Sequence, residues 1–269
     1  MRNKMGDRYR VSGAGKRKKL SRGFPFTGTR HLSPVNCFSF IILHSAFCIF
    51  LCVACAPSGG VEGEAKMKED GKGGALLYAA LGDSTGVGVG AREGGYVARL
   101  FRRIVDVRPG SKLTNMCVSG ATTEDVLRSQ IEPALAARPT LITLGIGIND
   151  VGHQMNVETF ARNYETIITR LKRANAPIVI TNIPDVSLAP VVSTNERAEV
   201  AERIMLFNRR IEEIASRHGL MVVDAFKATH ETIPSRPEFF SDDGFHPSDK
   251  GYEYWAEMMW PTVKKAMGE

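Results

Sequence analysis

Short apolar runs alternate with amphipathic stretches along residues 75–265. The first run, Ala75 to Leu81, is almost continuously apolar and breaks at Gly82. Runs of this kind are typical of parallel strands that are covered on both faces. We predict five such strands, at residues 75–82, 112–118, 141–146, 178–183 and 221–224.

In the stretches between these runs, apolar residues recur three and four positions apart, which is the period of an amphipathic helix. The predicted helices cover residues 96–105, 122–137, 157–174 and 196–218, and a last one begins near Ser248. Thr122 can cap the second of these helices, with Asp125 in its first turn. Strands separated by helices predict a parallel sheet with right-handed crossovers, so we expect a three-layer α/β/α sandwich.

The first 56 residues differ from this pattern in their composition. Residues 1–36 contain ten Lys or Arg against one acidic residue, Asp7, and residues 37–56 contain no Lys, Arg, Asp or Glu. A helix of twenty apolar residues spans roughly 30 Å, the thickness of a bilayer core. A basic segment before an apolar run predicts a signal or a membrane anchor. We therefore expect export to a bacterial cell envelope or periplasm, or secretion if the leader is simply cleaved.

The apolar run ends at residues 51–56, which resemble a bacterial lipoprotein box with Cys55 as the cysteine to be lipidated. Ala54 is the small residue that such a box needs, although Cys52 stands where the pattern usually has Leu. A cleaved signal, a lipid anchor on Cys55 and an uncleaved anchor are all open from the sequence.

Residues 57–74 contain too few apolar side chains to bury and predict a flexible tether, which leaves residues 75–269 as a single domain. Because residues 1–36 carry a charge of about +9 and the whole chain +6, residues 57–269 carry about −3. The folded domain thus lacks the basic balance of a nucleic-acid-binding protein. Its one cysteine, Cys117, can form no disulfide within the domain, so we expect the apolar core to stabilise it.

Ser84 stands immediately beyond the first predicted strand. Ligands of open α/β sheets bind beyond the carboxyl ends of the strands, so we expect chemistry at this hydroxyl. A nucleophilic serine needs a histidine base, a carboxylate that orients the base, and donors for an oxyanion. His246 follows Asp243 by three residues, a spacing at which the carboxylate can reach the ring, and Asp242 competes for the same role.

Candidate oxyanion donors lie at the ends of the predicted strands. Gly120 ends the segment after the second strand, and it has no side chain to keep a ligand away from its N–H. Asn149 follows the third strand and can direct its side-chain amide at the same point. The backbone N–H of Ser84 would be a third donor.

Residues 75–265 resemble the SGNH hydrolases, also called GDSL esterases/lipases. Four blocks occur in the order of that family, namely Gly82-Asp83-Ser84, Gly120, Gly147-Ile148-Asn149-Asp150 and Asp243-Gly244-Phe245-His246. The resemblance implies the flavodoxin-like SGNH hydrolase fold. It also implies a catalytic triad of Ser84, Asp243 and His246, and an oxyanion hole formed by Ser84, Gly120 and Asn149. Thr85 stands where the GDSL pattern has Leu.

Two other motifs compete for the same glycines. Residues 82–86 also match the Gly-x-Ser-x-Gly elbow of α/β-hydrolases, but here the serine follows the first strand and the acid lies three residues before the histidine. Residues 86–90 have the spacing Gly-x-Gly-x-Gly, which differs from the dinucleotide fingerprint. Asp83 and Asp150 are expected to form hydrogen bonds within loops. No cluster of His, Asp and Glu suggests a metal, and we expect no cofactor.

We therefore expect a monomeric serine hydrolase that cleaves carboxylic esters through an acyl-enzyme. Thioesters, lysophospholipids and O-acetylated sugars all stay open as substrates, as do the acyl length and the alcohol part. The alternative is a membrane-tethered binding protein that keeps the fold without turnover. A missing triad residue would favour that alternative, and none is missing.

Overall fold

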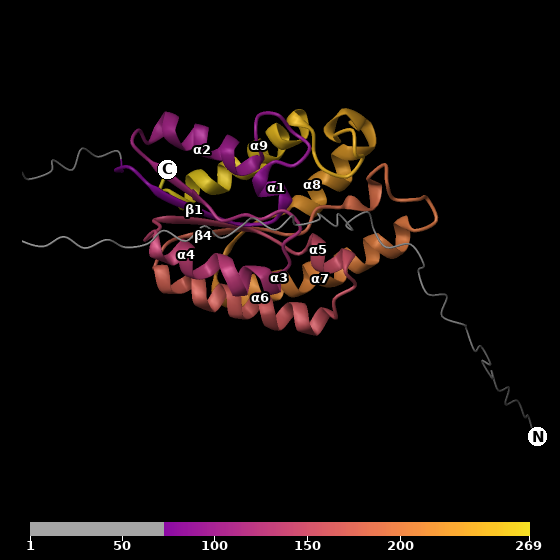
Figure 1. Cartoon of the computed structure of the whole chain (residues 1–269), viewed down its shortest axis with the longest axis horizontal. Coiled ribbons are helices and arrows are strands. Elements are labelled where there is room, and N and C mark those ends of the chain that lie inside the picture. Colours follow the sequence, from indigo (N-terminus) through magenta and orange to yellow (C-terminus); the bar gives the residue numbers. More distant parts are fainter. Residues whose placement is uncertain (1–72) are drawn as a thin grey trace, which may run out of the picture.

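A five-stranded parallel sheet forms the middle layer of the computed structural model, which describes residues 73–269 (Figure 1). The strands lie in the order β2-β1-β3-β4-β5, and every neighbouring pair is parallel. Their bounds are β1 Leu77–Gly82, β2 Lys112–Asn115, β3 Leu141–Gly145, β4 Ile178–Thr181 and β5 Met221–Val223. This order is the flavodoxin-like one, in which ligands bind beyond the carboxyl ends of the strands near the point between β1 and β3 where the winding reverses. The predicted fold class is confirmed.

Helices cover both faces of the sheet. α2 and α9 lie on one face, and α4, α6 and α7 lie on the other (Figure 1). The helices are α1 Ser84–Val87, α2 Tyr96–Val107, α3 Thr123–Asp125, α4 Ile131–Ala136, α5 Ile148–Gly152, α6 Val157–Leu171, α7 Arg197–His218, α8 Ala225–Thr232 and α9 Asp249–Ala266. The helices predicted at residues 96–105, 157–174 and 196–218 are present as α2, α6 and α7, and the helix expected to begin near Ser248 is α9, for which Ser248 is the N-cap.

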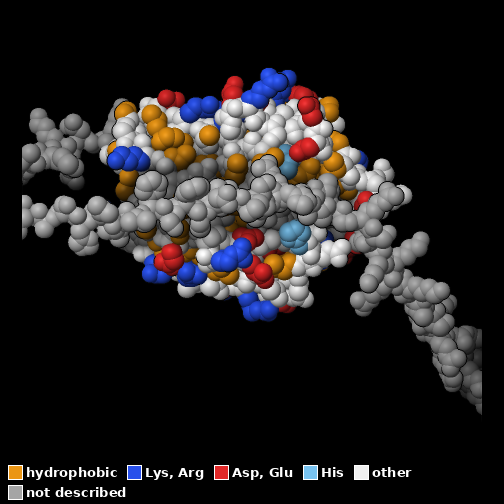
Figure 2. All heavy atoms as spheres, viewed as in Figure 1, with side chains coloured by type: hydrophobic (Ala, Val, Ile, Leu, Met, Phe, Trp, Pro, Cys, Tyr) orange, Lys and Arg blue, Asp and Glu red, His pale blue; other side chains and the backbone are white. Residues whose placement is uncertain are grey.

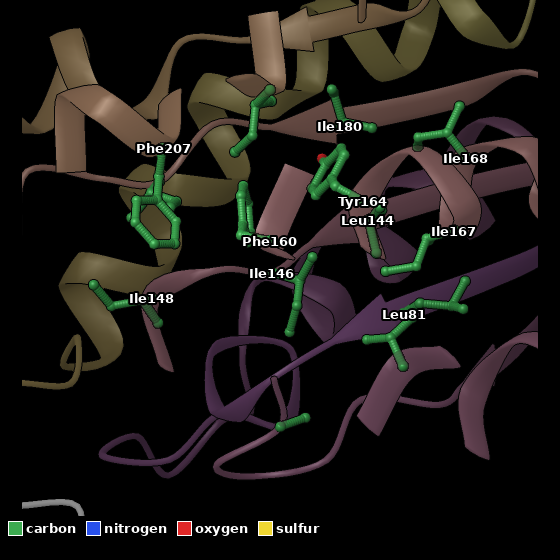
Figure 3. Close-up of a cluster of buried hydrophobic side chains, with 14 of the residues drawn as sticks. Leu81, Leu144, Ile146, Ile148, Phe160, Tyr164, Ile167, Ile168, Ile180 and Phe207 are labelled. Atoms are coloured by element: carbon green, nitrogen blue, oxygen red, sulfur yellow. The ribbon is translucent and has the colours of Figure 1, made fainter. Parts of the chain in front are cut away.

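The two faces of the sheet are packed with large apolar side chains. Leu81, Leu144 and Ile180, from three central strands, belong to one buried cluster with Phe160 of α6 and Phe207 of α7 (Figure 3). On the opposite face the core contains a different set of fully or almost fully buried side chains, Tyr78, Tyr96, Leu100, Trp255 and Met259. Because the central strands are covered on both faces, the ends of these strands are held rigidly and can position a site.

Three local features differ from the sequence prediction. β2 ends at Asn115, three residues before the predicted end of the strand. The helix predicted over residues 122–137 is divided into α3, a π-helical turn at Val126–Gln130, and α4. Pro133 has no N–H to donate to the preceding turn, which disfavours a continuous α-helix here. α1, α5 and α8 were not predicted from the sequence.

The predicted leader, residues 1–56, and the tether up to residue 72 lie outside the described residues. Within residues 73–269, no helix is both long and apolar enough to cross a bilayer. On the part of the described domain that Figure 2 leaves visible, basic and acidic side chains are interspersed.

Candidate active site

The end of β1 delivers Ser84 to the edge of the sheet. Gly82 has a φ of +153°, and a Cβ at this position would lie 2.3 Å from the carbonyl oxygen of Gly145 on β3, so a side chain is excluded at the end of β1. Asp83 then caps α1 by accepting a hydrogen bond from the N–H of Thr85 at 3.0 Å. Ser84 is the first residue of α1 and is only 3% exposed.

The loop that carries the other two predicted triad residues is closed by its own backbone. Phe240 and Pro247 form an antiparallel bridge, and the N–H of Ser241 donates to the carbonyl of His246 at 2.8 Å. The Asp243 Oδ1 atom accepts the N–H groups of Phe245 and His246, both at 2.8 Å. These contacts fix the loop directly before α9.

The three predicted triad residues come together in the structure. His246 Nδ1 lies 2.6 Å from Asp243 Oδ2, and His246 Nε2 lies 3.0 Å from Ser84 Oγ. This geometry lets the carboxylate hold one ring nitrogen while the other nitrogen faces the hydroxyl. The carboxylate at the histidine is that of Asp243, which the sequence favoured over Asp242.

Asp243 is held as an anion. Partial burial alone would raise the pKa of its carboxyl, but hydrogen bonds from His246, from the backbone N–H groups of Phe245 and His246, and from the Ser241 hydroxyl lower that pKa to about 2. Asp243 is therefore charged over the whole neutral range and can stabilise a positive charge on the His246 ring.

Gly120 lies in a backbone conformation that side chains rarely adopt, with a φ of +79°. Apart from Gly120 itself and its two chain neighbours, no atom lies within 4 Å of the point where its Cβ would stand. Glycine is thus required here by the backbone angle, and the open space beside it leaves room for a ligand.

Asn149 is the second residue of α5 and is 1% exposed. Its Nδ2 donates a hydrogen bond to the carbonyl oxygen of Ala121 at 2.8 Å. An amide nitrogen carries two hydrogens, so one N–H remains for an oxyanion while the other fixes the side chain on the segment that follows Gly120.

Two buried aspartates form hydrogen bonds inside this site. Asp150 accepts the backbone N–H of Thr123 at 3.1 Å and its hydroxyl at 2.5 Å, and burial, as the main cause, raises the pKa of Asp150 to about 6. Burial likewise raises the pKa of Asp83, while the two hydrogen bonds from Thr85 and the nearby His246 oppose that shift. Both aspartates form hydrogen bonds, as the sequence predicted, but Asp150 bonds from α5 to the start of α3 and Asp83 bonds as the cap of α1, so these bonds lie at helices and not within loops.

Gln130 is a site residue that sequence reasoning missed. Its side chain accepts from the N–H of Gly82 at 2.9 Å and donates to the carbonyl of Gly82 at 2.8 Å. It reaches β1 from the π-helical turn, a feature that often marks functional sites. No local pattern could have linked a glutamine to a backbone group 48 residues earlier.

A narrow cavity of about 70 Å³ lies beside His246. Asp83 and Thr85 line it near the nucleophile, whereas Ser84, Gly120 and Asn149 do not. Most of the remaining wall is apolar and includes Ile146, Ile148, Ile183, Val186, Ile233, Phe239, Phe240 and Phe245. The cavity therefore lies next to the nucleophile, because its wall includes His246 and the two residues on either side of Ser84.

Residues 80–254 match the family model of the GDSL-like Lipase/Acylhydrolase family, and the chain belongs to this family. An acetylxylan esterase of Geobacillus stearothermophilus is 27% identical over 61% of this chain and 78% of its own length. The spore germination lipase LipC of Bacillus licheniformis is 27% identical over 68% of this chain and 94% of its own length. A lipase/acylhydrolase from Enterococcus faecalis has a similar structure, with a TM-score of 0.58 at 26% identity over 71% of this chain and 96% of that one.

Family membership and these relatives establish the reaction class. The protein is a carboxylic ester hydrolase, in agreement with the sequence prediction. Within residues 73–269, His, Cys, Asp and Glu form no group of three or more that could hold a metal ion. Cys55, the candidate for lipidation, lies outside the described residues.

Proposed function

We propose that the protein hydrolyses esters of short carboxylic acids through an acyl-enzyme on Ser84. The observation that carries this proposal is the hydrogen-bonded chain from Asp243 through His246 to Ser84, with contacts of 2.6 and 3.0 Å. Nucleophile, base and orienting carboxylate are the parts that acyl transfer to a serine needs.

In the first half-reaction, Ser84 Oγ attacks the ester carbonyl carbon as His246 Nε2 takes the hydroxyl proton. The N–H groups of Ser84 and Gly120 and the free N–H of Asn149 stabilise the negative oxygen of the tetrahedral intermediate. The bond to the alcohol then breaks, and His246 gives its proton to the leaving oxygen. In the second half-reaction, water attacks the acyl-enzyme with His246 again as base, which releases the acid and restores Ser84.

The oxyanion role of Asn149 gives a prediction with a defined signature. Asn149→Ala should lower kcat by about 10²–10³ with little change in KM, because the amide acts mainly when charge develops on oxygen. Asn149→Asp should be at least as damaging. Asn156→Ala, which removes the side chain that caps α6, serves as a control. Steady-state kinetics on a p-nitrophenyl ester measures both constants, and unchanged kcat with raised KM would assign Asn149 to plain substrate binding.

The size of the cavity supports a short acyl group. One water-sized group needs roughly 10–15 Å³ by this measure, so the cavity of about 70 Å³ holds about five to seven such groups. An acyl chain of about two to five carbons matches that space. Acetyl esters of sugars are within this range, and one of the similar proteins is named an acetylxylan esterase.

The acyl preference can be tested by filling the cavity. Ile233 lines it and is only half-buried, so Ile233→Trp can reduce the space without disrupting the core. We expect this variant to lower kcat/KM for p-nitrophenyl butanoate about tenfold or more relative to p-nitrophenyl acetate, since lost space for even one methylene is worth about 1–3 kcal/mol in an apolar pocket. If the ratio for the two esters is unchanged, the acyl chain does not enter the cavity.

A further inference from the structure

Two neighbouring residues of α5, Asn149 and Asp150, are both hydrogen-bonded to the segment that follows Gly120. Asn149 Nδ2 donates to the carbonyl of Ala121 at 2.8 Å. The Asp150 carboxylate accepts the N–H of Thr123 at 3.1 Å from each oxygen, and the Thr123 hydroxyl at 2.5 Å. We call these contacts between residues 149–150 and residues 121–123 the brace.

The brace is buried, and α6 makes a further contact with it. Asp150 and Thr123 are both 0% exposed, and Asn149 is 1% exposed. The Thr123 hydroxyl also accepts a hydrogen bond from Asn163 Nδ2 of α6 at 3.2 Å. Since buried hydrogen bonds to a charged group are stronger than neutral ones, the contact between Asp150 and Thr123 is the stiffest part of the brace.

We propose that Asp150 is a positioning residue that holds Gly120 and Asn149 in one geometry, so that both can donate to the same oxygen in the transition state. Asp150 acts through its neighbours and touches no reacting atom. The proposal rests on the oxyanion roles that Gly120 and Asn149 have in the proposed function. Small displacements matter here because a preorganised donor is useful only where the charge develops.

Burial of the Asp150 carboxylate lowers the stability of the fold, which supports a functional role for this residue. Burial disfavours the charged carboxylate and raises the pKa of Asp150 to about 6, and the negative charge of Asp83 acts in the same direction. The folded state therefore binds a proton more readily than the unfolded chain, so this carboxylate lowers stability as pH rises from about 4 through 6. An ionised Asp150 is thus kept although it is unfavourable for folding at neutral pH.

The test is a graded series of variants of the full-length chain, assayed on p-nitrophenyl acetate. Asp150→Ala should lower kcat about 30-fold with KM within twofold of wild type, because only transition-state stabilisation is lost. Asp150→Asn keeps one acceptor oxygen and should recover most of that loss. Thr123→Val should lower kcat about fivefold and Thr123→Ser should restore it, which keeps the proposal testable if Asp150→Ala does not fold.

A second readout separates positioning from plain stability. Phenylboronic acid forms a tetrahedral adduct with an active serine, and its inhibition constant should rise in parallel with the loss of kcat. Asp185→Ala is the matched control, because Asp185 is also buried and also accepts a backbone N–H and a hydroxyl, both from Ser187. That variant should lose thermal stability and change kcat less than threefold.

Coupling to Asn149 completes the test. In an Asn149→Ala background, Asp150→Ala should lower kcat less than it does in the wild type, since residues that act as a unit are not additive. The proposal is overturned if Asp150→Ala and Thr123→Val fold with wild-type kcat, or if they raise KM alone. If the wild type shows no hydrolysis that depends on Ser84, the proposed function itself is wrong and the role of Asp150 is overturned with it.

Discussion

Ser84→Ala and His246→Ala are each expected to lower kcat by about 10⁵–10⁶, and the double variant should be little worse than either single one. The reason is that nucleophile and base act as a unit, so removal of one makes the other useless. The 3.0 Å contact between His246 Nε2 and Ser84 Oγ is the structural basis of that coupling. Single-turnover and steady-state rates of the three variants on one activated ester measure the effect.

His230→Ala provides a matched control for this experiment. His230 also pairs with an aspartate, with its Nδ1 atom 2.7 Å from Asp185 Oδ2, but its side chain is 62% exposed. We expect this variant to retain wild-type kcat. An irreversible phosphonate inhibitor should label the wild type once, on Ser84, and should not label Ser84→Ala. A double variant that loses the sum of both single effects, or an active Ser84→Ala, would contradict the triad.

The sheet and its main helices could be predicted because their signals are local. Apolar runs such as Leu141–Gly145 are buried on both faces, and helices such as α6 and α7 repeat apolar residues with a period that the sequence displays. Strand boundaries were less accurate, since β2 ends at Asn115 although apolar residues continue to Val118. The apolar pattern records burial, whereas the end of a strand depends on which backbone groups find partners.

The candidate site could be predicted only in part. Ser84, Asp243 and His246 were found because each stands in a recognisable block, and the structure places them in hydrogen-bond contact. Gln130 and the cavity depend on residues that are far apart in the chain, and α1 and α5 are too short to show a helical period. Contacts between residues that are far apart in the chain cannot be predicted from the local spacing of apolar and polar residues.

Residues 1–72 lie outside the described part of the chain, and the predictions made for them concern localisation. Membrane attachment, export and lipidation of Cys55 stay predictions, as does the monomeric state of the domain. They are independent of the chemistry, because every residue in the proposed reaction lies between Ser84 and His246.

Asp243→Asn is expected to lower kcat by about 10⁴ while the loop keeps its shape. An amide at this position would donate a hydrogen to His246 Nδ1 and so favour the tautomer whose proton is on Nε2. That tautomer cannot accept the proton of Ser84. In the wild type, the N–H groups of Phe245 and His246 each lie 2.8 Å from Asp243 Oδ1. The Oδ1 atom of an asparagine can accept the same two hydrogen bonds, so the loop should keep its fold.

Asp242→Asn is the matched control, because Asp242 is the exposed neighbour that competed for the same role in the sequence. Its kcat should stay within twofold of wild type.

The dependence of folding stability on pH gives an independent check on Asp243. Its folded-state pKa of about 2 lies below the ordinary 3.8, so its contribution to stability is present above about pH 4 and is lost as the pH falls towards 2. Denaturant unfolding at pH 2, 3, 4 and 6 should show this acid-dependent loss in the wild type and a smaller one in Asp243→Asn. If Asp242→Asn rather than Asp243→Asn abolishes turnover, the assignment of the triad acid is wrong.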